Sequence, residues 1–248
     1  MARALSKLGH CSRSRASALI LAGRVRLNEV VRRDPETPVQ LEKDIIEVDG
    51  ARVTPGARVY LMLNKRRGVV TTTSDEKGRD TVYASLGAGL PWVAPVGRLD
   101  KASEGLLLLT NDSEWSARLL APETHLEKTY HVQVEALVDA DLIDSLTKGV
   151  ATGDGDFLRA KAARLLRSGV RNTWLEIVLD EGKNRQIRRM LAHFSLNVKR
   201  LVRVAIGPLA LGKLPKGAFR ALAADEKSAL DRAMASGSRR AGSKQADN

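Results

Sequence analysis

Residues 95–112 read PVGRLDKASEGLLLLTND, and this stretch carries the strongest fold signal in the chain. Four consecutive leucines at 106–109 are typical of a strand that is buried on both faces. The polar turn before them must then lie at one end of a sheet, where a rigid element holds Asp100 on a loop. Loops held in this way commonly carry function. The alternative is that Asp100 is a turn residue that accepts hydrogen bonds from nearby backbone amides.

Strand-like runs alternate with turns around this stretch, and two segments have a helical pattern. The expected strands are 60–63, 69–73, 106–110, 130–134 and 174–179, and the expected helices are 114–120 and 186–194. The strands are numerous and follow no regular strand–helix repeat. They therefore predict an α+β fold built on a mixed, largely antiparallel sheet with flanking helices.

The first 50 residues are predicted to form a small α/β module of their own. Ser12 can cap a helix that begins at Arg13 and ends before Gly23. Residues 51–58 contain Pro55 and Gly56, which interrupt regular structure, and are the expected linker. A larger domain should then span 59–235. The basic tail 236–248 has no apolar residue larger than alanine, so we expect it to be disordered.

The chain is strongly basic and its charge is unevenly distributed. It has 41 Lys and Arg against 29 Asp and Glu, a formal charge of +12, which favours a polyanionic partner, nucleic acid before an anionic membrane. Residues 1–33 hold eight basic side chains against one acid, and residues 183–203 hold seven against none. The sequence thus predicts two basic surfaces.

Composition also excludes several classes of protein. Cys11 is the single cysteine, which rules out an intrachain disulfide and fits a reducing compartment. No apolar run is long enough to span a bilayer. The four histidines are scattered without a second cysteine, which gives a metal site no support. We expect a cytoplasmic protein without metal.

Three stretches resemble the pseudouridine synthases. Residues 97–112 are similar to their Gly-Arg-Leu-Asp and Leu-Leu-Leu-Leu-Thr-Asn-Asp signature, and residues 127–130 (EKTY) and 181–190 (EGKNRQIRRM) match the same family in order. Asn184 and Arg185 before Gln186 are similar to the RsuA-like branch. The N-terminal module resembles the S4 RNA-binding domain through residues 11–16 (CSRSRA) and 22–28 (AGRVRLN).

The resemblance implies a reaction that needs no cofactor. A uridine in RNA becomes its C-glycoside isomer when the N1–C1′ bond breaks, the base turns, and C5 joins C1′. Asp100 is then the nucleophile, acting on the base or on the sugar, and Tyr130 packs against the target base. Arg98 helps to displace that base from its stack, because neither reacting carbon is open to attack inside a helix.

Helix geometry and the resemblance both select Arg188 as the cation beside Asp100. At about 100° per residue, Ile187 and Met190 fall on one apolar stripe of the expected helix, and Arg188 lies at its edge. An edge position lets the guanidinium reach a carboxylate while its stem is buried. Arg185 and Arg189 fall on the opposite face, towards solvent or phosphate.

The expected RNA partner is structured ribosomal RNA, with 23S slightly favoured over 16S, bound by a monomer. Aromatic residues make up 4% of the chain, so RNA shape around a loop or bulge should determine specificity more than base stacking. The residues expected to contact RNA are Arg13, Arg15, Arg24, Arg26, Lys65, Arg98, Lys128, Lys183, Arg185 and Arg189.

Two other functions fit parts of the sequence. A non-catalytic S4-type RNA-binding or ribosome-assembly protein would show the same basic surfaces. A glycoside hydrolase would need paired carboxylates, and Asp100 with Glu104 is the close pair in this turn. Glu104 stands where the family usually has serine, and we expect it to face solvent or to pair with Lys101.

Overall fold

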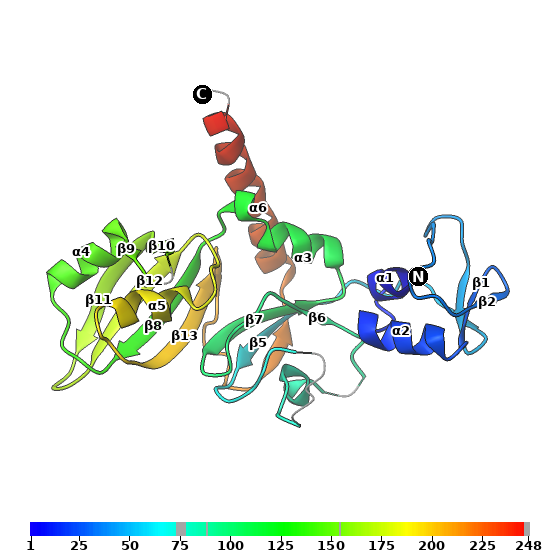
Figure 1. Cartoon of the computed structure of the whole chain (residues 1–248), viewed down its shortest axis with the longest axis horizontal. Helices are drawn as coiled ribbons and strands as arrows, with labels where there is room; N and C mark the ends of the chain where they lie inside the picture. Colours follow the sequence, from blue (N-terminus) through cyan, green and yellow to red (C-terminus); the bar gives the residue numbers. More distant parts are fainter. Residues whose placement is uncertain (73–77, 88, 154, 246–248) are drawn as a thin grey trace.

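The computed structural model describes residues 1–72, 78–87, 89–153 and 155–245, with the backbone alone for 238–245. Figure 1 shows an elongated molecule with the N-terminal module at one end and helix α6 projecting from the middle. The elements of the module are α1 (Ala2–Lys7), α2 (Arg13–Leu21), β1 (Val25–Leu27), β2 (Val30–Arg32), β3 (Ile46–Val48) and β4 (Ala51–Arg52).

The remaining elements form the larger domain. They are β5 (Tyr60–Lys65), η1 (Val82–Ser85), β6 (Ala94–Val96), β7 (Glu104–Thr110), α3 (Ser113–Leu120), η2 (Pro122–Thr124), β8 (Lys128–Val134), α4 (Ala140–Lys148), β9 (Val150–Ala151), β10 (Phe157–Leu158), β11 (Ala162–Ser168), β12 (Thr173–Leu179), α5 (Gln186–His193), β13 (Val198–Ile206), β14 (Leu209–Ala210), β15 (Phe219–Ala221) and α6 (Ala224–Gln245).

The N-terminal module is a four-stranded sheet, in the order β2-β1-β3-β4, packed against α1 and α2. Ser12 caps α2 as predicted, because its side chain accepts a hydrogen bond from the backbone N–H of Arg15 at 3.2 Å. Strand β4 pairs with β3 and extends the module to Arg52. The segment between the two domains is therefore shorter than the predicted linker.

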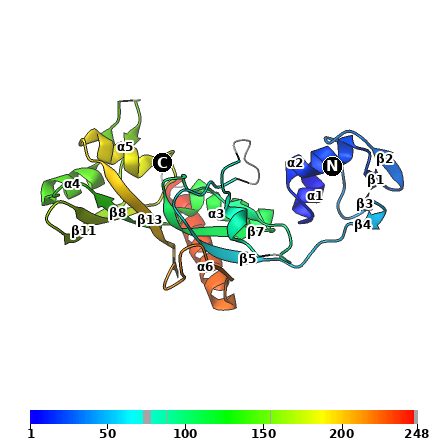
Figure 2. The ribbon, with the colours of Figure 1, turned by 90° about the horizontal axis from the view of Figure 1, so that it is seen from below.

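Asn111 ties the connecting segment to the end of β7. Its side chain accepts from the N–H of Val59 and donates to the carbonyl of Ala57, both at 2.8 Å. A Cβ on Gly9 of the module would lie 3.4 Å from Asn111. The Lys7 ammonium also pairs with Glu114 of α3 at 2.7 Å. The module thus contacts the larger domain at the β7–α3 corner. Figure 2 shows the connecting segment that runs from β4 of the module to β5.

A nine-stranded mixed sheet forms the centre of the larger domain, which confirms the predicted α+β class. The main path is β11-β12-β8-β13-β7-β5-β15, with β14 beside β13 and β6 beside β7. Every described pairing in it is antiparallel except β7 with β13, which is parallel and spans two residue pairs, Val202 with Glu104 and Arg203 with Gly105. We call these four residues the seam, because they join the two halves of the sheet.

The leucines of β7 are buried on both faces, as the sequence predicted. Leu106 and Leu108 pack with α3 and α6 on one face, and Leu107 and Leu109 pack with β5 and the segment around Val82 on the other. All four side chains are 0% exposed. Strand β7 is thus packed on both faces, which gives the loop that precedes it a rigid support.

Gly105 allows the two strands of the seam to approach. Its φ is +102°, and a Cβ placed on it would lie 2.2 Å from the carbonyl oxygen of Arg203. A side chain cannot be accommodated at that distance from a backbone atom. Glycine at this position is therefore required for the observed pairing of β7 with β13.

Two expectations about regular structure were wrong. In residues 69–72, the described part of the predicted strand 69–73, Val70 forms an isolated bridge with Thr81; residue 73 lies outside the described part of the chain. The tail predicted to be disordered continues α6 as far as Gln245, although its glycines and serines do not favour a helix. Residues 246–248 lie outside the described part. Within the described residues, no helix is both long and apolar enough to cross a membrane.

Candidate active site

Asp100 lies on the loop between β6 and β7, and the buried side chain of Lys65 binds the backbone of this loop. The Lys65 side chain is 1% exposed, and its ammonium donates to the carbonyls of Asp100 at 3.0 Å, Ser103 at 2.9 Å and Arg66 at 3.2 Å. Burial lowers the pKa of Lys65 to about 8, although the charges of Asp100 and then Glu104 act to raise it. Lys65 was predicted to contact RNA, and its burial shows that this prediction was wrong.

Three further contacts hold the same loop. The Thr71 hydroxyl donates to the carbonyl of Leu99 at 2.8 Å, and the N–H of Gly68 donates to that of Lys101 at 2.8 Å. From the other side, the Arg188 guanidinium donates to the carbonyl of Ala102 at 3.2 Å. Backbone contacts on five consecutive residues, 99–103, therefore determine where Asp100 lies, which is the preorganisation that a reactive carboxylate needs.

Asp100 opens onto a cleft of about 640 Å³. Tyr130 lines this cleft from β8, half-buried between the apolar clusters of the two half-sheets. Exposed Arg98 lies on the same loop as Asp100 and also lines the cleft. The structure thus brings together three side chains that the sequence placed at the reaction. Their chemical roles remain predictions.

Arg185 makes the ion pair that was expected of Arg188. An Nη of Arg185 lies 3.4 Å from the Asp100 carboxylate, with the two side chains 51% and 36% exposed. The predicted opposite-face placement of Arg185 was wrong because Arg185 lies at the N-cap of α5 with φ +48°, in the left-handed region. The angular spacing of a regular helix therefore does not apply to it.

Arg188 supports the Asp100 loop instead of pairing with the carboxylate. Its guanidinium donates to Ala102 and, at 3.4 Å, to the carbonyl of Val198, so it joins the loop to the start of β13. Burial, followed by the charge of Arg185, lowers the pKa of Arg188, whereas the nearby charge of Asp100 acts to raise it. Arg188 stays a candidate catalytic residue.

Glu104 faces inward, contrary to the prediction that it faces solvent or pairs with Lys101. Its side chain is 5% exposed and accepts two hydrogen bonds from Arg200 at 3.0 Å and one from Lys216 at 2.9 Å. Burial acts to raise the pKa of Glu104, but these two cations together hold it below its usual value. Glu104 is thus a structural carboxylate at the seam.

Some of the other residues predicted to contact RNA are exposed, and others form ion pairs within the protein. Arg13, Arg15 and Arg26 are exposed on the N-terminal module. Arg24 is also exposed but pairs with Asp49. Arg189 was expected to face solvent or phosphate, but it is 20% exposed and pairs with Asp156 at 2.7 Å.

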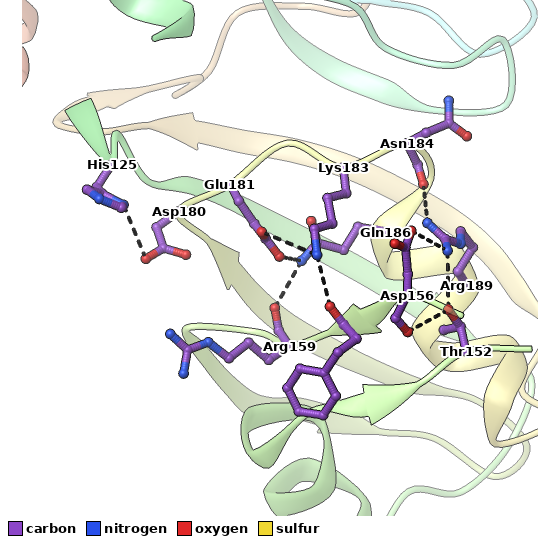
Figure 3. A network of polar contacts seen from close by, with 11 residues as sticks. His125, Thr152, Asp156, Arg159, Asp180, Glu181, Lys183, Asn184, Gln186 and Arg189 are labelled. Atoms are coloured by element: carbon purple, nitrogen blue, oxygen red, sulfur yellow. Dashed lines mark hydrogen bonds and ion pairs between the residues drawn. The ribbon is translucent and has the colours of Figure 1, made fainter. Parts of the chain in front are cut away.

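A polar network joins the loop before α5 to the β9–β10 hairpin (Figure 3). Gln186 donates to the carbonyl of Arg159 at 3.0 Å and to Glu181 at 2.5 Å, and the Lys183 ammonium donates to the carbonyl of Phe157 at 2.9 Å. On the helix side, Arg189 contacts the hairpin through Asp156 and Thr152. The network anchors the segment that carries Arg185. Its partners come from distant segments, and no local pattern indicates them.

The described residues hold no group of three or more His, Cys, Asp or Glu side chains that could bind a metal ion. The cleft is lined by Asp100, Asp180 and Glu181 together with several cations.

Comparisons with known proteins agree with this arrangement. A model of the RNA pseudouridylate synthase family matches residues 59–193, and a model of the S4 domain matches residues 2–46. An uncharacterized RNA pseudouridine synthase of Aquifex aeolicus is 41% identical over 231 residues, 93% of this chain and 92% of the relative. One of Mycobacterium tuberculosis is 37% identical over 236 residues, 94% of this chain and 92% of the relative.

A solved structure is similar over almost the whole chain. It is described as the crystal structure of a pseudouridylate synthase and superimposes with a TM-score of 0.65 at 28% identity, covering 92% of this chain and 98% of that one. Both domains are therefore accounted for. With its S4 domain followed by a synthase domain, the chain belongs to the RNA pseudouridylate synthase family, in its RsuA-like branch, and is an isomerase that acts on RNA.

Proposed function

We propose that the protein converts a specific uridine of ribosomal RNA to pseudouridine, with Asp100 as the nucleophile and with the target base flipped out of its helix. The cleft at Asp100 has about 640 Å³, within the range of roughly 300–1,000 Å³ typical of small-molecule sites. A nucleoside fits that volume and a paired helix does not. Base flipping brings the reacting carbons to the carboxylate.

The observation that carries the proposal is the Asp100 carboxylate on its anchored loop. Five loop residues have backbone contacts to other segments, Arg185 brings a positive charge to the carboxylate, and Tyr130 lines the same cleft. A positioned nucleophile beside an aromatic ring suits attack on a nucleoside held in one orientation. A protein that only binds RNA has no need of this arrangement.

The basic surfaces on both domains support ribosomal RNA as the substrate. Exposed Arg13, Arg15 and Arg26 of the S4 domain can contact phosphates at a distance from the cleft, while Arg98 contacts the RNA beside it. Phosphate contacts supply affinity and register. Shape around a loop or bulge then selects the uridine. The protein acts as a cytoplasmic monomer without a cofactor, and 23S RNA is the first substrate to test.

Carbodiimide mapping of ribosomal RNA tests activity and target together. Cells that lack the protein should lose one pseudouridine, which a plasmid copy of the natural protein restores. A copy with Asp100→Asn should bind the RNA with nearly natural affinity and restore nothing, because the amide keeps the shape and loses the nucleophile. Full restoration of the pseudouridine by Asp100→Asn would show that Asp100 is not the nucleophile.

A further inference from the structure

Two cations lie beside Tyr130 on the floor of the cleft. Arg203 of β13 is directly opposite Tyr130 in the register of β8 with β13, so the two side chains share a face of the sheet. Lys128 precedes Tyr130 by two residues on β8 and shares that face as well. All three line the cleft onto which Asp100 opens.

Arg203 is buried with part of its guanidinium unpartnered. The residue is 7% exposed, and its Nε donates to the carbonyl of Leu106 at 2.7 Å. One terminal nitrogen, Nη2, is buried without a hydrogen-bond partner among the described residues. A buried charged donor without an acceptor costs several kcal/mol. Such a cost is retained most readily where a ligand supplies the missing acceptor.

Lys128 is also without an acid partner. Among the described residues, none forms a hydrogen bond or a salt bridge with its half-buried side chain. Burial and then the charge of Arg203 lower the pKa of Lys128, and the charge of Asp180 opposes them. Two other cations of the cleft are paired, Arg185 with Asp100 and Lys183 with Glu181, and Arg98 is exposed to solvent. Positive charge is therefore left uncompensated at Lys128 and Arg203.

We propose that Lys128 and Arg203 stabilise the uracil base as an anion during the isomerisation. The inference rests on the proposed function. When the N1–C1′ bond breaks, its electron pair stays with the base, and the negative charge spreads over N1 and the ring oxygens O2 and O4. The nucleophile holds C1′ until C5 of the turned base attacks it, which releases Asp100 as a carboxylate. The proton on C5 then leaves and N1 gains one, so that atoms and charge balance.

The position of the pair favours the base over a backbone phosphate. Lys128 and Arg203 are both neighbours of Tyr130 on one face of the sheet, Lys128 along β8 and Arg203 across on β13, and Tyr130 is the residue expected to pack against the target base. A phosphate would instead be met by exposed cations at the mouth of the cleft, such as Arg98. Donors in a partly buried site act strongly on charge that develops there, and removal of one such donor lowers kcat by about 10²–10³-fold in known enzymes.

A change in the acidity of the leaving base tests the proposal. Fluorine at C5 withdraws electrons from uracil and makes its anion more stable, so a 5-fluorouridine substrate needs less help from the protein. Single-turnover rates would be measured with synthetic RNAs that span the mapped uridine and carry either uridine or 5-fluorouridine at that position. Disappearance of the starting nucleoside from nuclease digests gives the rate.

Lys128→Met should lower the single-turnover rate on the uridine substrate by about 10²-fold. The loss of rate on the 5-fluorouridine substrate should be at least tenfold smaller, and the RNA affinity should be unchanged. Lys161→Met is the matched control, because Lys161 pairs with Glu127 outside the cleft lining, and it should retain natural rates on both substrates. Arg203→Lys keeps a positive charge in the buried position but removes the terminal guanidinium nitrogens. Like Lys128→Met, it should slow the reaction of the uridine substrate more than that of the 5-fluorouridine substrate.

Four outcomes separate the ideas. An equal loss of rate on both substrates overturns the proposal. A loss of RNA affinity at an unchanged rate also overturns it and assigns Lys128 to a phosphate. A natural rate in Lys128→Met with intact folding overturns it as well. Failure of the natural protein to convert the mapped uridine refutes the proposed function itself, and this inference with it.

Discussion

Substitution of Gly105 by alanine should damage the seam and the active site together. A Cβ would lie 2.2 Å from the Arg203 carbonyl, and such contacts are essentially never below 3.0 Å, so the strands must part by at least 0.8 Å, the difference of the two values. The positive φ of +102° adds about 1–2 kcal/mol of strain for a residue with a side chain. The summed loss should be about 3 kcal/mol.

The displacement also reaches the reacting groups. Asp100 precedes β7, whereas Tyr130 lies on β8 beyond β13, so parting at the seam changes the separation of these two residues. A misplacement of about 1 Å can slow a reaction by about 10²-fold. Single-turnover rates at a temperature where the variant is fully folded would separate this effect from the loss of stability.

Gly153→Ala provides the control for Gly105→Ala. The φ of Gly153 lies outside the positive range that strains a side chain, and a Cβ on it has nothing within 4 Å, so its replacement should leave both the urea midpoint and the rate unchanged. Natural stability and natural rates in Gly105→Ala would refute the reasoning, since the seam would then tolerate a side chain. A stability loss at natural rate would show that the seam does not position Asp100.

Three further predictions concern buried and paired charges. Lys65→Met removes the ammonium that donates to three carbonyls. The pKa of Lys65 is about 8 in the folded protein and 10.5 in the unfolded chain, so between pH 8 and pH 10.5 the unfolded chain binds more protons than the folded protein. Urea titrations should therefore show the natural protein gaining stability relative to the variant from about pH 8 upwards. The pKa of Glu104 is instead lowered on folding, so its contribution is present above its usual pKa and is lost as the pH falls; Glu104→Gln should flatten the acid side of the urea-midpoint profile. Arg185→Ala should slow isomerisation and leave stability within about 0.5 kcal/mol, whereas Arg188→Ala should lower both, because Arg188 also holds a loop carbonyl; equal stability loss in the two variants would contradict this assignment.

Local pattern was sufficient to predict the strand β7, the cap of α2 and the class of fold. The leucines of 106–109 determine their own burial, because an uninterrupted apolar run has no polar face to expose. Ser12 caps a helix through atoms three residues away. Resemblance supplied Asp100 and Tyr130, and the structure places them in one cleft.

Pairings between distant strands could not be predicted in the same way. Glu104 meets Arg200 because β7 and β13 run parallel in one particular register, and no local periodicity specifies that register. Lys65 looked like a surface cation because its three acceptors are backbone carbonyls, which have no sequence signal. The predicted face for Arg185 was wrong because Arg185 is the N-cap of α5 and has a positive φ, so it does not follow the angular spacing of the helix.

The contact of Asn111 with the connecting segment restrains the position of the S4 domain relative to the active site. With Val59 and Ala57 bonded to one side chain, and with Lys7 paired to Glu114, the exposed arginines of the S4 domain lie at a set separation from Asp100. We therefore expect the distance from the target loop to the next RNA helix, as well as the shape of that loop, to affect how well an RNA binds.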